Sequence, residues 1–262
     1  DTLALVPYPQ AAAPLGRGQV RLEVRAAGLT SGDVLNPLGQ NPGMTGLGTE
    51  AAGLVVETGP GVTELSAGQR VMGLVPGGFG PLAVADARLL VPIPRGWSYA
   101  QAASVPEAFL TAYYALRDLG GLAAGESVLV HAAASGVGMA AVQLASYWGA
   151  KVFGTAGELE QGLLRAGGWS AGWLASSQTM DFEDRFRAAT GGRGVDVVLN
   201  SLAGELVDAS MRLLAPGGRL VEMGKTDIRD AAAVSRAYPG ISYRTCEAAE
   251  AGPERLGQTL AE

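Results

Sequence analysis

The sequence predicts an α/β protein in which a doubly wound parallel sheet follows a β-rich, barrel-like domain. Two observations support this prediction. Residues 1–98 contain short strand-like segments separated by turns rich in glycine and proline, a pattern that suits a small barrel or sandwich. From residue 99 onward, apolar runs typical of strands buried on both faces alternate with helical segments, which is the pattern of a parallel sheet.

The first region is expected to hold four strands. Residues 19–26 (QVRLEVRA) alternate apolar and polar side chains, as a half-buried strand does. The other strands are expected at residues 51–56, 70–74 and 81–85, and turn-rich residues 57–61 follow the second of them. Strands this short, joined by turns this frequent, are typical of a small barrel.

The second region begins with a helix expected over residues 99–119, which contains an early proline, Pro106. Residues 127–132 (SVLVHA) form a continuous apolar run and predict a strand buried on both faces. Beyond it the sequence predicts strands at 151–155, 195–200, 219–223 and 241–245, and helices at 137–148, 158–166, 181–190 and 204–214. This alternation predicts a sheet of the Rossmann type.

Composition argues against several classes of protein. Of the 262 residues, 48% are hydrophobic and 17% charged, which is enough to bury the cores of two lobes. A net charge of −6 without a Lys/Arg cluster argues against a nucleic-acid partner. No run approaches the roughly 20 apolar residues of a membrane span, and residues 1–8 do not resemble a signal peptide. A single cysteine, Cys246, fits a reducing compartment, so a cytoplasmic location is expected.

The segment His131–Ala145 (HAAASGVGMAAVQLA) carries the most informative motif. It places Gly136-x-Gly138-x-x-Ala141 between an expected strand and an expected helix. We assign the tight turn to Gly136, the close approach of a pyrophosphate to Gly138, and helix–strand packing to Ala141. The N–H groups at the start of the helix, including that of Val137, would then bind the phosphates. The motif therefore predicts a dinucleotide bound at Gly136, Val137 and Gly138.

Two later strand ends are expected to extend this site, because ligands of doubly wound sheets bind at the carboxyl ends of the strands. Asn200 and Leu202 follow one expected strand, and Met223 and Gly224 follow another. These residues could reach along a dinucleotide toward its nicotinamide. For Asn200, the ordinary polarity of a loop is an equally open interpretation.

Residue types argue against zinc and hydrolase chemistry. Residues 48–53 (GTEAAG) resemble the segment in which zinc alcohol dehydrogenases place a histidine before the glutamate, but Thr49 stands at the histidine position. With one histidine and one cysteine in the chain, no zinc site of that kind can form, and no metal is expected. Glu50 is then expected to be a structural hydrogen-bond partner. No Gly-x-Ser-x-Gly elbow occurs, and His131, at the end of a buried strand, is expected to be structural.

Nearly the whole chain resembles the enoylreductase domains of modular polyketide synthases, a zinc-free group within the medium-chain dehydrogenase/reductase superfamily. The segments VLNSLAGE and EMGKTDIRD are the most specific parts of the resemblance. It implies that NADPH reduces the α,β-double bond of an enoyl thioester, which an acyl carrier protein presents on phosphopantetheine. It also implies neighbouring synthase domains such as a ketoreductase.

The resemblance implies a split organisation of the chain. Residues 1–98 would form the N-terminal part of a substrate-binding domain, and residues 99–248 the dinucleotide-binding Rossmann domain. Residues 249–262 would begin the return to the substrate-binding domain. Several dozen further residues of that return are expected beyond Glu262.

The resemblance also implies roles for single residues. Lys225 of EMGKTD matches a lysine considered a proton donor, and Glu247 stands where relatives carry an aspartate that could pair with it. Thr111 is expected near the nicotinamide, and Thr155 opens the segment that holds the 2′-phosphate of NADPH in relatives. Asn41 occupies a catalytic position at which many relatives carry a tyrosine, although an amide cannot act as a comparable acid.

Several residues depart from the family pattern and leave alternatives open. Glu160 stands where relatives carry a lysine for the 2′-phosphate, and Gln178 replaces an arginine, so NADH is an alternative to NADPH. Lys225 could instead be a solvated lysine at a strand end. The chain could therefore be an active enoylreductase, a degenerate domain that keeps the fold without turnover, or a free-standing quinone or enone reductase.

Overall fold

The computed structural model describes residues 4, 6–39 and 47–262, and the chain divides into two compact units. The first unit contains the described residues up to Leu110 together with Ala249–Glu262, and the second unit is Thr111–Ala248. None of the helices in the described part of the chain has the length and apolar character that a bilayer span requires.

The boundary between the units differs from the one expected after residue 98. Pro106 has no backbone N–H and breaks the expected long helix into α2 (Tyr99–Ala103) and α3 (Pro106–Tyr113), which continues as the π-helical turn η3 (Tyr114–Leu119). Ala102 and Ala103 of α2 pack in one apolar cluster with residues of the first sheet. This burial assigns residues 99–110 to the first unit.

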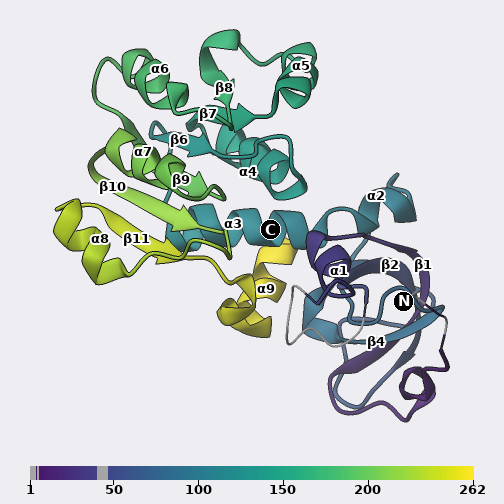
Figure 1. Ribbon diagram of the computed structural model, residues 1–262. Coiled ribbons are helices and arrows are strands. Elements are labelled where there is room, and N and C mark those ends of the chain that lie inside the picture. Colours follow the sequence, from purple (N-terminus) through teal and green to yellow (C-terminus); the bar gives the residue numbers. More distant parts are fainter. Residues whose placement is uncertain (1–3, 5, 40–46) are drawn as a thin grey trace. The chain divides into compact units, whose positions relative to one another are not determined.

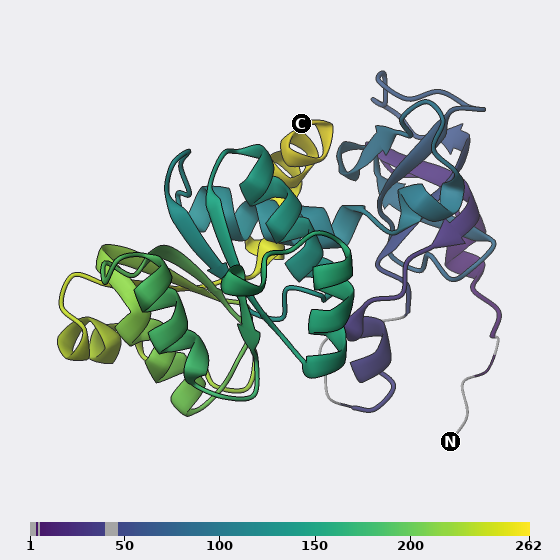
Figure 2. The same cartoon turned by 90° about the horizontal axis from the view of Figure 1, so that it is seen from above.

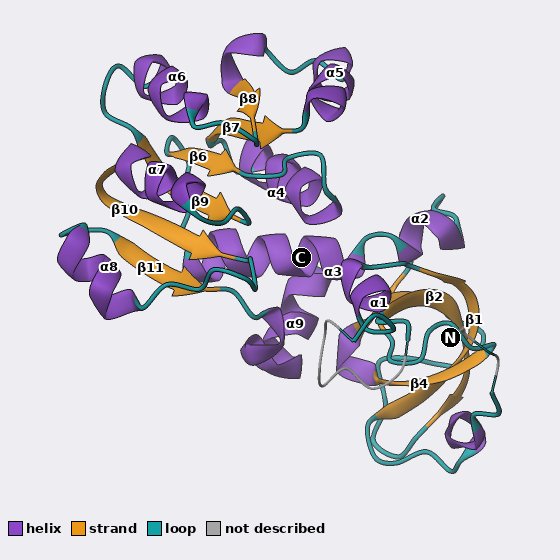
Figure 3. Cartoon of the chain, in the orientation of Figure 1, coloured by secondary structure: helices purple, strands orange, loops and turns teal. Residues whose placement is uncertain are grey.

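An antiparallel sheet forms the first unit, with the described strands in the order β4-β1-β2-β3-β5. Its core contains the alternate side chains of β1, among which Val20 and Leu22 are fully buried. Figure 3 shows these strands curving around that core. The strands are β1 (Gln19–Ala27), β2 (Glu50–Thr58), β3 (Arg70–Leu74), β4 (Leu82–Asp86) and β5 (Leu90–Pro92).

Short helices and the C-terminal segment complete the first unit. The helix α9 (Gly252–Ala261) contacts both η2 (Ala87–Leu89) and β5. An added Cβ at Gly257 of α9 would lie 2.2 Å from the carbonyl oxygen of Arg88, so a glycine is needed for this close packing. The remaining helices of the unit are η1 (Pro9–Ala12), α1 (Ser31–Leu35) and η5 (Ala248–Ala251), which begins at the last residue of the second unit.

A parallel sheet forms the second unit, with the described strands in the order β11-β10-β9-β6-β7-β8. The chain runs outward from β6 to β8, returns to β9 beside β6, and then runs outward on the other side. This order confirms the doubly wound Rossmann sheet, with its switch point between β6 and β9. The strands are β6 (Ser127–Val130), β7 (Lys151–Ala156), β8 (Leu174–Ser176), β9 (Val195–Asn200), β10 (Leu214–Glu222) and β11 (Ser242–Thr245).

Helices cover both faces of the parallel sheet. Figures 1 and 2 show α4 and α5 on one face and α6, α7 and α8 on the other. Every residue of β6 and β9 is buried between them, which explains their continuous apolar runs. The helices are α4 (Gly136–Tyr147), α5 (Glu158–Ala166), α6 (Asp181–Ala189), α7 (Glu205–Leu213), α8 (Ala231–Ala237) and the short η4 (Ala171–Trp173).

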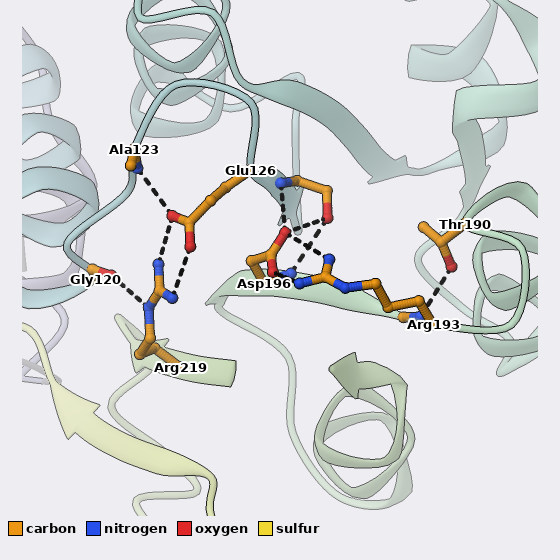
Figure 4. Close-up of polar contacts among 9 residues, drawn as sticks. Gly120, Ala123, Glu126, Thr190, Arg193, Asp196 and Arg219 are labelled. Atoms are coloured by element: carbon orange, nitrogen blue, oxygen red, sulfur yellow. Dashed lines mark hydrogen bonds and ion pairs between the residues drawn. The ribbon is translucent and has the colours of Figure 1, made fainter. Parts of the chain in front are cut away.

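Polar side chains tie the strands together at the amino-terminal end of this sheet (Figure 4). The Arg219 guanidinium on β10 binds both carboxylate oxygens of Glu126, at 3.0 and 2.7 Å. On β9, the Asp196 carboxylate accepts hydrogen bonds from the backbone N–H and hydroxyl of Ser127 and from Arg193. These partners compensate the buried charge of Asp196. They lie at the amino-terminal edge of the sheet, whereas ligands of this fold bind at the opposite, carboxyl-terminal edge.

Candidate functional site

The turn between β6 and α4 lies at the switch point of the sheet. The hydroxyl oxygen of Ser135 caps α4 by accepting a hydrogen bond from the Gly138 N–H at 3.1 Å. Ala132 makes the turn in the left-handed conformation, with φ of 49°. The N–H groups of Gly136 and Val137 then have no carbonyl partner within the helix, so they can bind an anion.

The structure corrects the roles assigned to the two glycines. An added Cβ at Gly138 would lie 2.2 Å from the Ala132 carbonyl oxygen, so Gly138 permits the packing of α4 against the turn. A Cβ at Gly136 would meet no described atom within 4 Å, so the open approach lies at Gly136. Gly138 therefore corresponds to the third glycine of the fingerprint, with Ala133 and Ser135 at the first two positions. Sequence reasoning placed the pattern three residues too late and missed Ser135, although a serine before a helix is a known capping signal.

Asn200 and Glu222 meet at the carboxyl ends of β9 and β10, where they are partners in the strand register. The Asn200 side-chain N–H₂ donates to a Glu222 carboxylate oxygen at 2.6 Å and to the Leu202 carbonyl at 3.0 Å. The other Glu222 oxygen accepts the Gly224 N–H at 2.7 Å. Burial raises the pKa of Glu222, and these hydrogen bonds lower it in part. Sequence reasoning missed Glu222, for which the signal was a charge inside the apolar strand RLVEM.

Lys225 and Glu247 form an ion pair just beyond the ends of β10 and β11. Their side chains are 60% and 50% exposed, so the pair is accessible and the ammonium is held without being buried. The start of the loop that carries Lys225 is fixed by a backbone hydrogen bond, in which the Met223 N–H donates to the Asn200 carbonyl at 2.8 Å. The contact between Lys225 and Glu247 is the one that the resemblance to the family implied.

His131 and Thr155 form a buried polar network that leaves neither side chain available to a ligand. The Ser210 hydroxyl donates to the Leu206 carbonyl at 2.7 Å, so it accepts from His131 Nε2 at 2.8 Å. The Thr155 hydroxyl then donates to His131 Nδ1, also at 2.8 Å. Burial lowers the pKa of His131 to about 3, which keeps the ring neutral. The structural role expected for His131 is confirmed; the Thr155 hydroxyl is engaged with this ring, and a cofactor contact at Thr155 stays a prediction.

Comparison with known proteins identifies the chain. Residues 136–243 match the zinc-binding dehydrogenase family, and residues 16–95 match the alcohol dehydrogenase GroES-like domain. The crystal structure of CurK enoyl reductase is similar with a TM-score of 0.87 and 36% identity, over 95% of this chain and 79% of that one. The chain belongs to the enoyl reductases of polyketide synthases.

Two further relatives extend this result. Over 249 residues, which are 95% of this chain, the enoyl reductase is 59% identical to the pikromycin polyketide synthase component PikAII of Streptomyces venezuelae. It spans 5–16% of the length of the polyketide synthases that it matches. The structure of mycobacterial Rv1454c complexed with NADPH is similar with a TM-score of 0.84 and 27% identity, over 98% of this chain and 81% of that one.

Where zinc alcohol dehydrogenases have a zinc-ligating histidine, this enoyl reductase has Thr49, which belongs to a hydrogen-bonded group with Glu50 and Glu107. Thr49 donates its hydroxyl to the Glu107 carboxylate at 2.5 Å, and Glu50 accepts the Glu107 N–H at 2.8 Å, which confirms the structural role expected for Glu50. Burial raises the pKa of Glu50 to about 7, and the nearby Glu107 and Asp33 carboxylates add to this effect. Among the described residues, no three His, Cys, Asp or Glu side chains are grouped as a metal site requires.

The N-terminus of α5 follows β7, where a Rossmann domain holds the adenosine ribose. The Glu160 carboxylate folds back and accepts the Gly157 N–H at 2.9 Å. Arg165 donates to the Gln161 side-chain oxygen at 2.8 Å, and the Gln161 N–H₂ in turn donates to the Ala156 carbonyl at 3.0 Å. The Gly157 N–H could otherwise bind a 2′-phosphate, but the Glu160 carboxylate occupies it and would repel the phosphate.

The remaining predicted site residues are not brought into one contact network. Leu202 supplies the backbone carbonyl that orients Asn200, and Met223 and Gly224 form the loop after β10. Thr111 is half-buried in α3 at the start of the second unit. Asn41 lies outside the described residues, so its role stays a prediction.

Proposed function

We propose that this enoyl reductase uses NADPH to reduce the α,β-double bond of an enoyl thioester carried by an acyl carrier protein. The observation that carries the proposal is the carboxyl edge of the parallel sheet. There the open helix N-terminus at Gly136, the buried Asn200 and the Lys225–Glu247 pair follow three neighbouring strands, as a dinucleotide site of this fold requires. The NADPH complex of Rv1454c supports the choice of cofactor class.

The residues at this edge fit a dinucleotide. The N–H groups of Gly136 and Val137 would hold the pyrophosphate, because the positive end of the α4 dipole lies behind them. The side-chain oxygen of Asn200 is buried without a hydrogen-bond partner in the part of the chain that the structure describes, so it suits a donor on the ligand. When bound, the dinucleotide supplies the hydride for the β-carbon of the substrate.

Lys225 is the proposed proton donor of the reaction. Addition of a hydride to the β-carbon moves the electrons of the double bond onto the thioester oxygen and leaves an enolate. The Lys225 ammonium, held by Glu247, would give its proton to the α-carbon and would be reprotonated from water. The positive charge of Lys225 would also stabilise the enolate before the proton moves.

Consumption of NADPH with crotonyl thioester as substrate tests this proposal. We expect NADPH oxidation that depends on the crotonyl thioester and that runs faster with a carrier protein than with a small thiol carrier. A simple quinone serves as the comparison substrate, and faster turnover of the quinone would favour a free-standing quinone reductase. Binding of NADPH without turnover of either substrate would favour the degenerate domain.

The proposed context follows from the relatives, which are multidomain synthases many times longer than this chain. We place the enoyl reductase beside further synthase domains such as a ketoreductase, with an enoyl-phosphopantetheine as its incoming substrate. A cytoplasmic location belongs to the same proposal. A full-length synthase that releases the unreduced product after loss of Lys225 would support this context.

A further inference from the structure

Glu222 is a buried carboxylate with an unusual set of partners for the end of a strand. It is 1% exposed, and it binds two amide donors from two different segments: the Asn200 side chain on β9 and the Gly224 N–H in the loop after β10. An added Cβ at Gly224 would lie 2.7 Å from the same carboxylate oxygen, so the loop approaches Glu222 as closely as a glycine allows. Burying a carboxylate is costly, so such a group requires a structural or functional reason.

The consequence of this arrangement is the orientation of Asn200. Its N–H₂ group is committed to Glu222 and to the Leu202 carbonyl, so the amide cannot rotate by half a turn without facing oxygen with oxygen. Its oxygen is thereby fixed, fully buried, and without a hydrogen-bond partner among the residues described. A buried oxygen left unpaired costs free energy until a donor reaches it.

The position of Asn200 limits which donor can reach it. Asn200 ends β9 at the switch point of the sheet. At this point the backbone N–H of His131, at the end of β6, donates to the Leu199 carbonyl at 3.1 Å. The Asn200 carbonyl also accepts the Met223 N–H, which begins the loop to Lys225. A donor at this point therefore belongs to the reacting half of the dinucleotide, whose nicotinamide ring carries a carboxamide N–H₂.

We propose that Glu222 is a positioning residue that holds the Asn200 oxygen as the acceptor for the nicotinamide carboxamide. The inference rests on the proposed function, because it requires a dinucleotide at this edge. Glu222 itself does not touch the cofactor: it orients Asn200, and Asn200 orients the ring.

A cofactor analogue without the donor tests this inference. In the 3-acetylpyridine analogue of NADPH, an acetyl group replaces the carboxamide and no N–H is present. The parent chain should bind NADPH about tenfold more tightly than the analogue, the value of one hydrogen bond to a buried acceptor. In Glu222→Gln the amide of residue 222 can donate to Asn200 and satisfy its oxygen, so the preference for NADPH should fall to about twofold or less.

Asp196→Asn is the matched control, since it removes a buried carboxylate from the other end of β9 (Figure 4). It should lower the melting temperature and leave the preference between the two cofactors unchanged. Asn200→Ala removes the acceptor while residue 222 stays a glutamate, so it should abolish the preference even if Glu222→Gln does not fold.

Three results would overturn the inference. The first is a preference that survives in the folded Glu222→Gln and Asn200→Ala variants. The second is an equal loss of affinity for both cofactors in these variants, which would assign the Asn200 oxygen to a ribose hydroxyl. The third is a parent chain that binds NADPH without preferring it to the analogue. A parent chain that binds neither cofactor would instead contradict the proposed function.

Discussion

Lys225 is the residue on which the chemistry of the proposed reaction depends most. Its ammonium is half-exposed and held by Glu247, so its removal should leave the fold intact. We expect Lys225→Ala to lower kcat by roughly 10²–10⁴-fold and to change KM for the thioester by much less, because the proton is transferred only in the transition state. Steady-state kinetics with crotonyl thioester measure both constants.

A second variant separates the proton from the charge at this position. Lys225→Met keeps the length of the side chain, while Lys225→Arg keeps its positive charge but is a far weaker acid. If Lys225 donates the proton, both variants should be slow. Activity close to that of the parent chain in Lys225→Met would mean that water or another group protonates the α-carbon.

For single residues, the sequence predicted the chemical role of a side chain better than it predicted the contacts of that side chain. It indicated that His131 is structural, because one histidine at the end of an apolar strand is a poor candidate for a base. It could not indicate that the Thr155 hydroxyl is hydrogen-bonded to that histidine, because 24 positions separate the two residues. The pair between Lys225 and Glu247 was suggested by resemblance to relatives, whereas Glu222 was missed because its partners come from another strand.

At the scale of elements, the contact between β6 and α4 distinguishes two glycines of similar appearance. Gly138→Ala should destabilise the second unit by about 2–4 kcal/mol, because its Cβ would lie 2.2 Å from the Ala132 carbonyl oxygen. Gly136→Asp should leave the melting temperature within a few degrees and weaken NADPH binding by at least tenfold, since its carboxylate would occupy the open approach. Thermal unfolding and calorimetric titration of both variants measure these effects. Comparable effects of the two variants on stability would contradict the assignment.

The N-terminus of α5 allows a test of cofactor choice. Glu160→Lys removes a carboxylate from the Gly157 N–H and adds a cation, so it should tighten NADPH by roughly one to two decades and leave NADH little changed. Glu160→Gln is the control, because its side-chain oxygen can still cap Gly157 while its charge is lost. It should give a smaller gain for NADPH than the lysine. Dissociation constants for both cofactors decide the matter: no gain in either variant would remove the 2′-phosphate from this helix end.

Elements with a clear period were predicted from the sequence, and those without one were not. The helix α5 and the strands β3 and β9 have the expected bounds, and each is marked by a regular apolar pattern between glycine or polar breaks. The strands β5 and β8 are three residues long, too short for any period to be visible. The helices α8 and α9 were missed because they contain few large apolar residues, and tertiary contacts rather than local pattern stabilise them.

On the scale of the whole molecule, the two units differ in how their stability depends on pH. In the first unit the pKa of Glu50 is raised to about 7 and that of Glu107 is also raised, both chiefly by burial. The folded unit therefore keeps protons that the unfolded chain loses near pH 4.5. The stabilisation from Glu50 is complete below about pH 4.5 and is lost as the pH rises through about 7, and Glu107 acts in the same direction.

The second unit contains groups whose effects on stability oppose one another. The pKa of His131 is lowered to about 3, so the unfolded chain takes up a proton below pH 6.5 that the folded unit does not, and stability falls as the pH falls from 6.5. The raised pKa of Glu222 acts in the other direction. The second unit should therefore respond less to pH between 5 and 8 than the first.

Hydrogen exchange resolved by peptide measures the two units separately. After correction for the intrinsic pH dependence of exchange, peptides from β2 and β3 should be better protected at pH 5 than at pH 8, and peptides from β6 and β9 should change less. Glu50→Gln keeps an acceptor for the Glu107 N–H and has no charge to bury, so it should raise protection of the first unit at pH 8 and reduce its dependence on pH. First-unit protection that is equal at both pH values in the parent chain would mean that Glu50 is hydrated in the folded state and ionises near its ordinary pKa.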